Sequence, residues 1–153
     1  MNALPEVGEG KRGPDGHLGY LLRQAANAHR LAMERALSGL EVTPPQFTVM
    51  TMLDAYPGCS SADLARLSML TPPTITVIIG NLEKRGAISR RAHTAHGRIQ
   101  QIEVTAEGRK ILKSCRERVH ATEAILAEGF SEEDLLVIRR WLSGTACALS
   151  AEG

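Results

Sequence analysis

The chain has 153 residues and a net charge of +1, and 43% of its residues are hydrophobic while 23% are charged. This balance is typical of a soluble globular protein and excludes a disordered chain, and the length fits one domain. No apolar run approaches the roughly 20 residues that a membrane-spanning helix needs. Only five residues are aromatic, so we expect a core of aliphatic side chains, which suits packed helices.

Charge is distributed unevenly along the chain. Residues 60–110 contain eight Lys or Arg and four Asp or Glu, a surplus of four positive charges, whereas the flanking segments are slightly negative. A nucleic-acid-binding segment inside a larger scaffold has this distribution. The sequence therefore predicts that DNA contacts lie between Ser60 and Thr105.

The N-terminal part divides into a tail and a long helix. Residues 1–16 include four glycines and two prolines, which predicts a flexible tail. Over residues 18–40, apolar residues recur at helical spacing. Such a helix extends about 34 Å at about 1.5 Å per residue, which is long for a small domain and indicates a scaffold or dimerisation helix.

Three helices with clear start signals follow. Thr43 and Thr71 each precede two prolines, and Ser60 or Ser61 begins a short helix, so each helix has a capping side chain. The first is expected to run from residue 44 until Tyr56-Pro57-Gly58 stops it, and the others are expected over 62–67 and 71–84, with a tight turn at 68–70. Cations and Gly86 at the end of the third helix favour a C-terminus there.

A hairpin and two more helices complete the pattern. Residues 87–91 and 99–104 are expected to be strands with a polar tip at 93–97. Helical periodicity predicts helices over 106–129 and 132–149. The expected fold is therefore mainly α with a small β-hairpin: a winged helix-turn-helix core with long additional helices.

In such a unit the second helix of the helix-turn-helix enters the major groove, and an Arg of the hairpin reaches the minor groove. Ile75, Ile78 and Ile79 must face the core, and no Lys or Arg occupies the first two turns of this helix. We therefore expect apolar and short polar readout there, with more weight on DNA shape. The expected DNA contacts are Ser61, Thr71, Pro72, Pro73, Thr74, Thr76, Val77, Asn81, Lys84, Arg90, Arg91, His96 and Arg98.

Five short motifs occur in order: VTPPQFTV at 42–49, ADLAR at 62–66, NLEKRG at 81–86, GR at 97–98 and VTAEG at 104–108. Together they resemble the MarR family of bacterial transcription regulators over roughly residues 18–150. The resemblance implies a homodimer that binds pseudo-palindromic double-stranded promoter DNA, usually as a repressor. It also implies release from DNA by a small, often phenolic or otherwise aromatic, ligand.

The resemblance also assigns parts of the chain. It implies one domain over 17–150, with dimerisation helices 18–40, 106–129 and 132–149 and a DNA-binding unit over 44–105. A ligand pocket between the first long helix and the DNA-binding unit would be lined by Leu22, Ala25, His29, Phe47, Met50, Leu67 and Met69.

One position departs from the family pattern. The family wing usually carries an Asp two residues before an Arg, and it holds that Arg in place. Here the Arg is Arg98 and the earlier position is His96. A neutral His is a weaker anchor than a carboxylate, whereas a charged His would add to phosphate attraction.

Other functions are less well supported. A small-molecule-binding or protein-interaction module that has lost DNA binding stays open, because the second helix is poor in Arg and the wing lacks its Asp. His93 and His96 form an HxxH pair, but no nearby Cys or carboxylate completes a metal site, so neither a metal nor a cofactor is expected.

The cysteines and the chain start suggest the compartment. Cys115 and Cys147 lie on apolar stripes and are expected to be buried structural thiols rather than redox sensors. No catalytic set emerges, so the chain is not expected to be an enzyme. No secretory signal is visible, which predicts a cytoplasmic location without membrane attachment.

Overall fold

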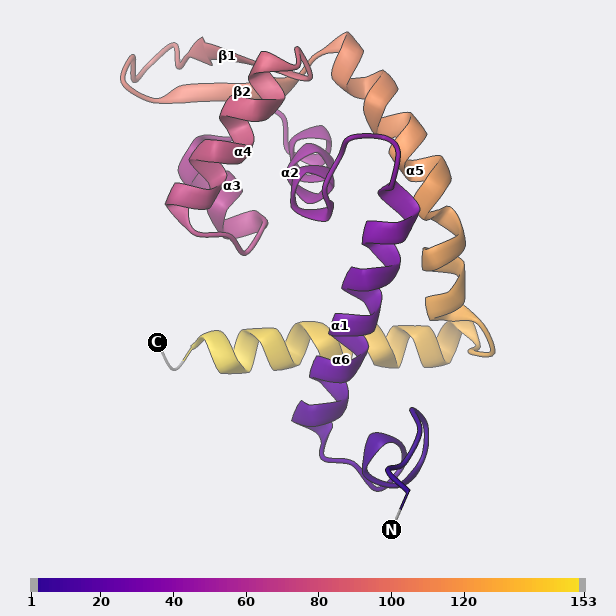
Figure 1. Ribbon diagram of the computed structural model, residues 1–153. Coiled ribbons are helices and arrows are strands. Elements are labelled where there is room, and N and C mark those ends of the chain that lie inside the picture. Colours follow the sequence, from indigo (N-terminus) through magenta and orange to yellow (C-terminus); the bar gives the residue numbers. More distant parts are fainter. Residues whose placement is uncertain (1–2, 152–153) are drawn as a thin grey trace. The chain divides into compact units, whose positions relative to one another are not determined.

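Figure 1 shows the computed structural model, which describes residues 3–151. The chain divides into two compact units, residues 1–119 and residues 120–153, and one long helix passes from the first into the second. The helices are η1 (Gly10–Arg12), α1 (Leu18–Leu37), α2 (Pro44–Ala55), α3 (Ser61–Leu67), α4 (Pro72–Lys84), α5 (Ala106–Ala127) and α6 (Glu132–Ser150), and the strands are β1 (Ile88–Ala92) and β2 (Gln100–Val104). The predicted fold class, with its order of helices and hairpin, is confirmed.

Helices α2, α3 and α4 begin where capping side chains were predicted, and α6 begins at a similar side chain. Thr43, Ser60 and Ser131 each accept a hydrogen bond from the backbone N–H three residues later, and in each case that later side chain accepts in return from the cap's own N–H. Thr71 caps α4 in the same way but without the return bond. These reciprocal bonds satisfy donors that a helix start leaves unpaired.

Helices α3 and α4 end at the predicted residues, whereas α1 and α5 end three and two residues earlier than predicted. The first helix was expected to reach residue 40, but α1 ends at Leu37 because Gly39 (φ +86°) and Glu41 (φ +55°) adopt left-handed backbone conformations. Gly129 (φ +82°) likewise follows the end of α5. A residue with positive φ stops a right-handed helix, and glycine adopts that conformation at the lowest cost.

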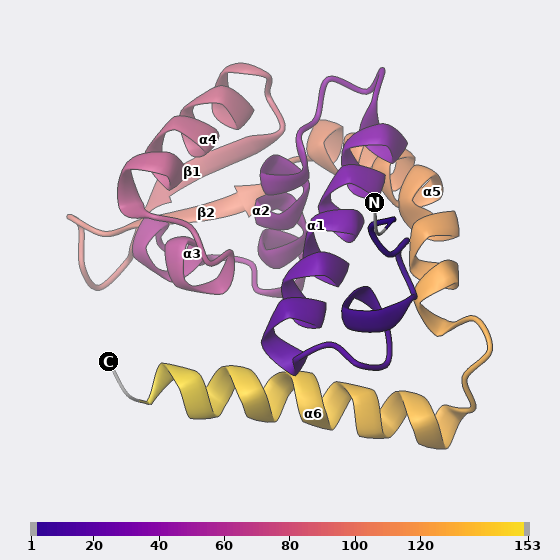
Figure 2. The same cartoon turned by 60° about the horizontal axis from the view of Figure 1, so that its bottom comes forward.

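The main core lies between α2, α3, α4, the hairpin and the start of α5. Its fully buried side chains include Leu53 of α2, Leu64 of α3, Ile79 of α4, Ile102 of β2 and Leu112 of α5. Each such side chain contributes about 1.5–3 kcal/mol when it leaves water. Figure 2 shows α2, α3 and α4 grouped beside the two strands.

A second, smaller core joins α1 to the first part of α5. It consists of Met33, Leu37, Val42, Cys115 and Val119. The two helices lie side by side in both views of the ribbon (Figures 1 and 2). The first unit therefore has two cores, one under the helix-turn-helix and one under α1.

The hairpin is antiparallel and is joined closely to α5. Ile88 pairs with Val104 at its base, and Ala92 pairs with Gln100 near its tip. Thr105 donates from its backbone N–H to the carbonyl of Ala87 at 3.0 Å. Gly108 lies so near that a Cβ added to it would stand 2.0 Å from the same carbonyl oxygen. Only glycine fits at this position.

Residues 3–16 contain more structure than the sequence predicted. The predicted tail forms the turn η1, and the Arg12 side chain donates to the Gln24 side chain of α1 at 3.2 Å and to the Pro5 carbonyl at 3.1 Å. Gln24 donates back to the carbonyl of Arg12 at 3.1 Å. These residues are therefore folded against α1.

In the second unit, α6 has no buried residue. Its exposed apolar side chains are Leu136, Val137, Trp141, Leu142 and Leu149. No helix within residues 3–151 is long and apolar enough to cross a membrane.

Candidate nucleic-acid interface

The α4 helix presents the outer face that the sequence predicted. Ile75, Ile78, Ile79 and Leu82 are buried, and the expected contact residues Thr71, Pro72, Pro73, Thr74, Thr76, Val77, Asn81 and Lys84 are all exposed. Val77 is 62% exposed, although it is a large aliphatic side chain. An exposed apolar residue on an otherwise polar helix face is suited to contact with a thymine methyl group.

Hydroxyl groups at the start of α4 bond mainly within the helix. Thr71 Oγ1 accepts from the Thr74 backbone N–H at 3.4 Å, and the two hydroxyls lie 2.9 Å apart. Thr76 Oγ1 donates to the carbonyl of Pro72 at 2.9 Å. Their oxygens keep lone pairs that can accept hydrogen bonds from bases or water. Within residues 3–151, the side chains of Asn81 and Lys84 have no hydrogen bond or ion pair.

Two of the three hairpin arginines are paired with carboxylates. Arg90 donates to Glu83 of α4, with a shortest N···O distance of 2.7 Å, and Arg91 donates to Glu103 of β2 at 2.6 Å. These carboxylates cancel part of the positive charge of β1. All three arginines were expected to contact DNA, and neither carboxylate partner was predicted. The register could have revealed one pair, because Arg91 lies opposite Gln101, so Glu103 is its diagonal neighbour on the same face.

Arg98 is the exception among the three. It has no hydrogen bond or ion pair within the part of the chain that the structure describes, and it is exposed. It lines a cleft of about 350 Å³ between the hairpin and the start of α3, together with Ser61 and Arg90. The structure thus brings together three expected contact residues from α3, β1 and the segment before β2.

The tip of the hairpin is held by a residue that was not expected to do so. His93 Nδ1 accepts hydrogen bonds from the backbone N–H groups of Ala95 and His96, at 3.0 and 3.2 Å. The His96 side chain is exposed, and its ring centre lies 5.4 Å from that of His93. His93 therefore closes the turn with a ring nitrogen, whereas from the sequence it was considered only as a metal ligand.

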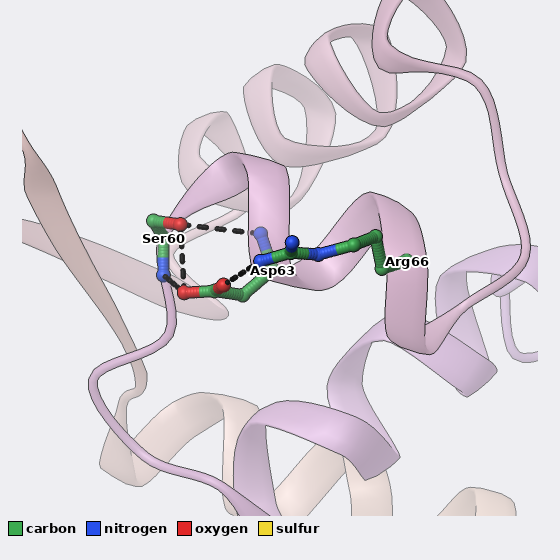
Figure 3. A network of polar contacts seen from close by, with 3 residues as sticks. All are labelled: Ser60, Asp63 and Arg66. Carbon is green, nitrogen blue, oxygen red and sulfur yellow. Dashed lines mark hydrogen bonds and ion pairs between the residues drawn. The ribbon is translucent and has the colours of Figure 1, made fainter.

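Figure 3 shows the polar network that fixes the start of α3. Asp63 Oδ2 accepts from the Ser60 hydroxyl at 2.7 Å and from the Ser60 N–H at 3.1 Å, and Arg66 donates to Oδ1 at 2.6 Å. The hydrogen bonds from Ser60, followed by that from Arg66, hold the pKa of Asp63 below its ordinary value. The network positions Ser61 at the edge of the cleft.

A cavity of about 300 Å³ lies between α1, α2 and the turn that joins α3 to α4. Its apolar wall consists of Met33, Pro44, Pro45 and Leu70. A cavity of this size and lining is suited to one small ring.

The same cavity has polar walls. They consist of His29, Arg30, Glu34, Thr48 and Ser68. Arg30 donates to Glu34 at 2.5 Å, and both side chains are about half exposed. Ser68 is 5% exposed, and its hydroxyl has no hydrogen-bond partner within residues 3–151.

The seven residues expected to line a ligand pocket do not gather around one cavity. Only His29 lines the cavity described above. Met50 is fully buried in the main core, and Phe47 packs against both cores. Leu67 and Met69 line two other surface grooves, while Leu22 and Ala25 lie on earlier turns of α1. Sequence periodicity cannot show where along α1 the other helices approach.

The cysteines differ in burial, and one of them departs from the prediction. Cys115 is fully buried as predicted, and burial raises the pKa of its thiol, as it also does for Cys59. Cys147 was expected to be buried but is exposed in the single chain. No group of three or more His, Cys, Asp or Glu suited to a metal ion occurs within residues 3–151.

Comparison with known proteins identifies the fold. A model of the MarR family matches residues 42–99. The HTH-type transcriptional repressor Rv2887 of Mycobacterium tuberculosis is 38% identical over 110 residues, which cover 72% of this chain and 79% of that protein. This chain belongs to the MarR family. The resemblance seen in the sequence is confirmed.

Solved MarR-family structures agree with this assignment. The Rv2887 protein in complex with salicylic acid is 34% identical, with a TM-score of 0.67 over 86% of this chain and 97% of that one. The repressor CouR bound to a 23-mer DNA duplex is 25% identical, with a TM-score of 0.76 over 85% and 92%. MarR proteins form a family of transcription regulators, not an enzyme family.

Proposed function

We propose that this MarR-family protein is a homodimeric repressor that binds pseudo-palindromic promoter DNA through α4 and the hairpin. The observation that carries the proposal is the cleft where the unpaired Arg98 and Ser61 lie together, beside an α4 face without internal partners for Asn81 and Lys84. In this arrangement α4 lies in the major groove, and Arg98 enters the negative minor groove. The start of α3 contacts the DNA phosphate backbone between the two grooves.

Dimer formation is supported by the exposed apolar side chains of the long helices. Trp141 and Leu149 of α6 are 41% and 69% exposed, and Leu18 of α1 is 67% exposed. Large apolar side chains exposed along one helix, as in α6, commonly mark a surface that another protein covers. A second copy would cover them and would place two α4 helices about 34–36 Å apart, one turn of DNA.

The cavity between α1 and α2 is the proposed effector site, and a small aromatic acid is the proposed ligand. Met33 and Leu70 offer apolar contact to a ring, and Arg30 offers a guanidinium to an acid group. The Arg30–Glu34 pair is half exposed, so a competing carboxylate can displace it at low cost. A polar group that reached the unpartnered Ser68 hydroxyl would recover about 1–3 kcal/mol.

DNA binding is tested by selecting bound duplexes from a random pool with the purified protein. The expected product is an inverted repeat with half-sites centred about 10 base pairs apart. Its affinity should fall steeply as salt rises, because displaced counterions drive the binding. A pool without an enriched repeat would contradict the proposal.

The effector site is tested by titrating the complex of protein and selected duplex with salicylate. The change Arg30→Gln should raise the concentration for half-release about fivefold to tenfold, because a charge-assisted bond is lost. The matched change Arg23→Gln, on the same helix but outside the cavity, should leave it unchanged. Equal effects of the two changes would refute this site.

The remaining expectations complete the proposal. We propose no catalytic activity and no bound cofactor, because the exposed side chains of α4 and the hairpin are proposed to contact DNA. A regulator of this kind acts in the compartment of the DNA, so we propose a cytoplasmic location.

A further inference from the structure

Arg85, directly after the last residue of α4, contacts a segment 45 residues earlier in the chain. One terminal guanidinium nitrogen donates to the carbonyl of Glu41 at 2.6 Å, and the other donates to the carbonyl of Leu40 at 2.9 Å. Both acceptors lie in the loop between α1 and α2. The α4 helix, which is the recognition helix of the proposed DNA complex, is thus joined at its C-terminal end to the loop that follows α1.

The contact depends on the shape of a guanidinium group. Two nitrogens in a fixed planar fork can bond two successive carbonyls at once, whereas the single ammonium group of Lys cannot reproduce this geometry. The loop presents these carbonyls because Gly39 (φ +86°) and Glu41 (φ +55°) turn its backbone. Both sides of the contact are therefore specifically shaped.

The contact also connects the two cores of the first unit. The buried side chains of α4 belong to the main core, whereas Leu40 packs against the second core, between α1 and α5. The charge of Arg85 is also felt by Cys115 in that second core, where it opposes the effect of burial on the thiol pKa. Arg85 therefore lies at the junction between the DNA-reading unit and the α1 scaffold.

We propose that Arg85 is a positioning residue, which fixes the recognition helix relative to the α1 scaffold and so sets the spacing of DNA half-sites. The inference rests on the proposed function, because α1 is part of the proposed dimer. The loop carbonyls take one N–H from each terminal nitrogen of Arg85 and hold the guanidinium at the loop, which distinguishes it from a mobile phosphate contact. Lys84, its neighbour, has no such partner and serves as the comparison.

The experiment measures binding of the full-length protein to the selected inverted repeat, to a single half-site and to repeats whose spacer is longer or shorter by one base pair. The variants are Arg85→Lys, Arg85→Met and Lys84→Met. Both Arg85 variants should weaken binding to the full repeat about tenfold, or about 1.4 kcal/mol. Their binding to a half-site should stay within about twofold, and they should discriminate less between spacers.

Salt dependence separates positioning from phosphate contact. The slope of log affinity against log salt should be unchanged in both Arg85 variants and smaller by about one in Lys84→Met. Arg85→Lys should not restore binding, because charge is not the feature that matters. Wild-type affinity in Arg85→Lys with a reduced slope in Arg85→Met would overturn the proposal. Unchanged spacer discrimination in both would also overturn it.

A loop variant tests the contact from the other side. Insertion of one glycine after Gly39 keeps Arg85 but moves the two carbonyls, and it should reproduce the spacer tolerance of Arg85→Lys. Wild-type discrimination in this variant would contradict the proposal. If the wild-type protein selects no repeat, the proposed function fails and this inference fails with it. If the wild type discriminates spacers and the variants do so equally, only this inference fails.

Discussion

The α4 helix and the hairpin both face the proposed DNA, but they are built from different chemistry. The exposed side of α4 carries proline, threonine, Val77 and Asn81, with its only cation at Lys84 in the last turn. The hairpin segment carries Arg90, Arg91 and Arg98, two of which are paired with carboxylates. The helix is therefore suited to reading base edges by shape and apolar contact, and the hairpin to electrostatic attachment through one arginine.

This difference separates specificity from affinity. Base contacts carry sequence information, whereas phosphate and minor-groove contacts mainly position the protein and make binding sensitive to salt. Changes in α4 should therefore alter which sequence is bound, and changes in the hairpin should alter how strongly any sequence is bound. Because Arg90 and Arg91 are paired with carboxylates, fewer hairpin residues control the strength of binding than the sequence indicates.

The largest expected effect is on stability, and it comes from the place where α5 packs against the segment between α4 and β1. Gly108→Ala would place a Cβ 2.0 Å from the Ala87 carbonyl oxygen, so the start of α5 must move away from Ala87, the residue before β1. We expect a loss of about 3 kcal/mol or more in the free energy of unfolding, measured in urea. Gly80→Ala, on α4 with no atom within 4 Å of the new Cβ, should instead stabilise by about 0.5–1 kcal/mol. Similar stability of the two variants would show that the close approach does not exist.

The second effect compares two arginines of the hairpin. Arg98→Ala should weaken DNA binding about tenfold or more and reduce the salt slope by about one, because Arg98 has no internal partner. Arg91→Ala should have a clearly smaller effect, because the Arg91 guanidinium is already engaged by Glu103 and is less free to bind a phosphate. Both are measured by gel-shift titration at several salt concentrations. An equal loss of affinity for Arg91→Ala would mean that the Arg91–Glu103 ion pair breaks when DNA binds.

A third effect isolates apolar readout by α4. Val77→Ala removes exposed methyl groups and should weaken binding about threefold to tenfold if they pack on a thymine methyl. The salt slope should stay unchanged, because no charge is removed. The thymines of the site are then replaced one at a time by uracil, which lacks the methyl group. At the thymine that Val77 contacts, this replacement should remove the difference in affinity between the wild type and Val77→Ala. A uniform difference at all positions would argue against direct contact.

The smallest effect concerns the start of α3. Hydrogen bonds from Ser60 lower the pKa of Asp63 below its ordinary value of 3.8, so the folded state favours the ionised carboxylate. The resulting stability is present above pH 3.8 and is lost as the pH falls through the lower, folded pKa. Asp63→Asn should cost about 0.5 kcal/mol at neutral pH and remove this part of the acid sensitivity. Ser61→Ala, beside the cap, should unfold like the wild type at every pH.

Local signals predicted the elements of this fold well. Thr43, Ser60, Thr71 and Ser131 mark helix starts because capping depends on a few neighbouring residues. The buried face of α4 followed from helical periodicity alone. These features depend on interactions within a few residues along the chain, which a single sequence records directly.

Contacts between distant segments could not be predicted in the same way. The pairing of Arg85 with the loop at Leu40 spans 45 residues, and the cavity lining depends on where α2 approaches α1. His93 was considered only as a metal ligand, whereas it accepts two backbone N–H groups. The family resemblance supplied the general function, but it could not supply these individual contacts.

The absence of buried residues in α6 has a consequence for how the protein behaves on dilution. Most of the stability of a helix in a protein comes from packing of its apolar face, so the 19-residue α6 depends on whatever covers its apolar side chains. If a second copy does so, helix formation and association are one equilibrium, and the apparent melting temperature rises with protein concentration. At low copy number, the amount of competent repressor would then fall more steeply than the number of chains.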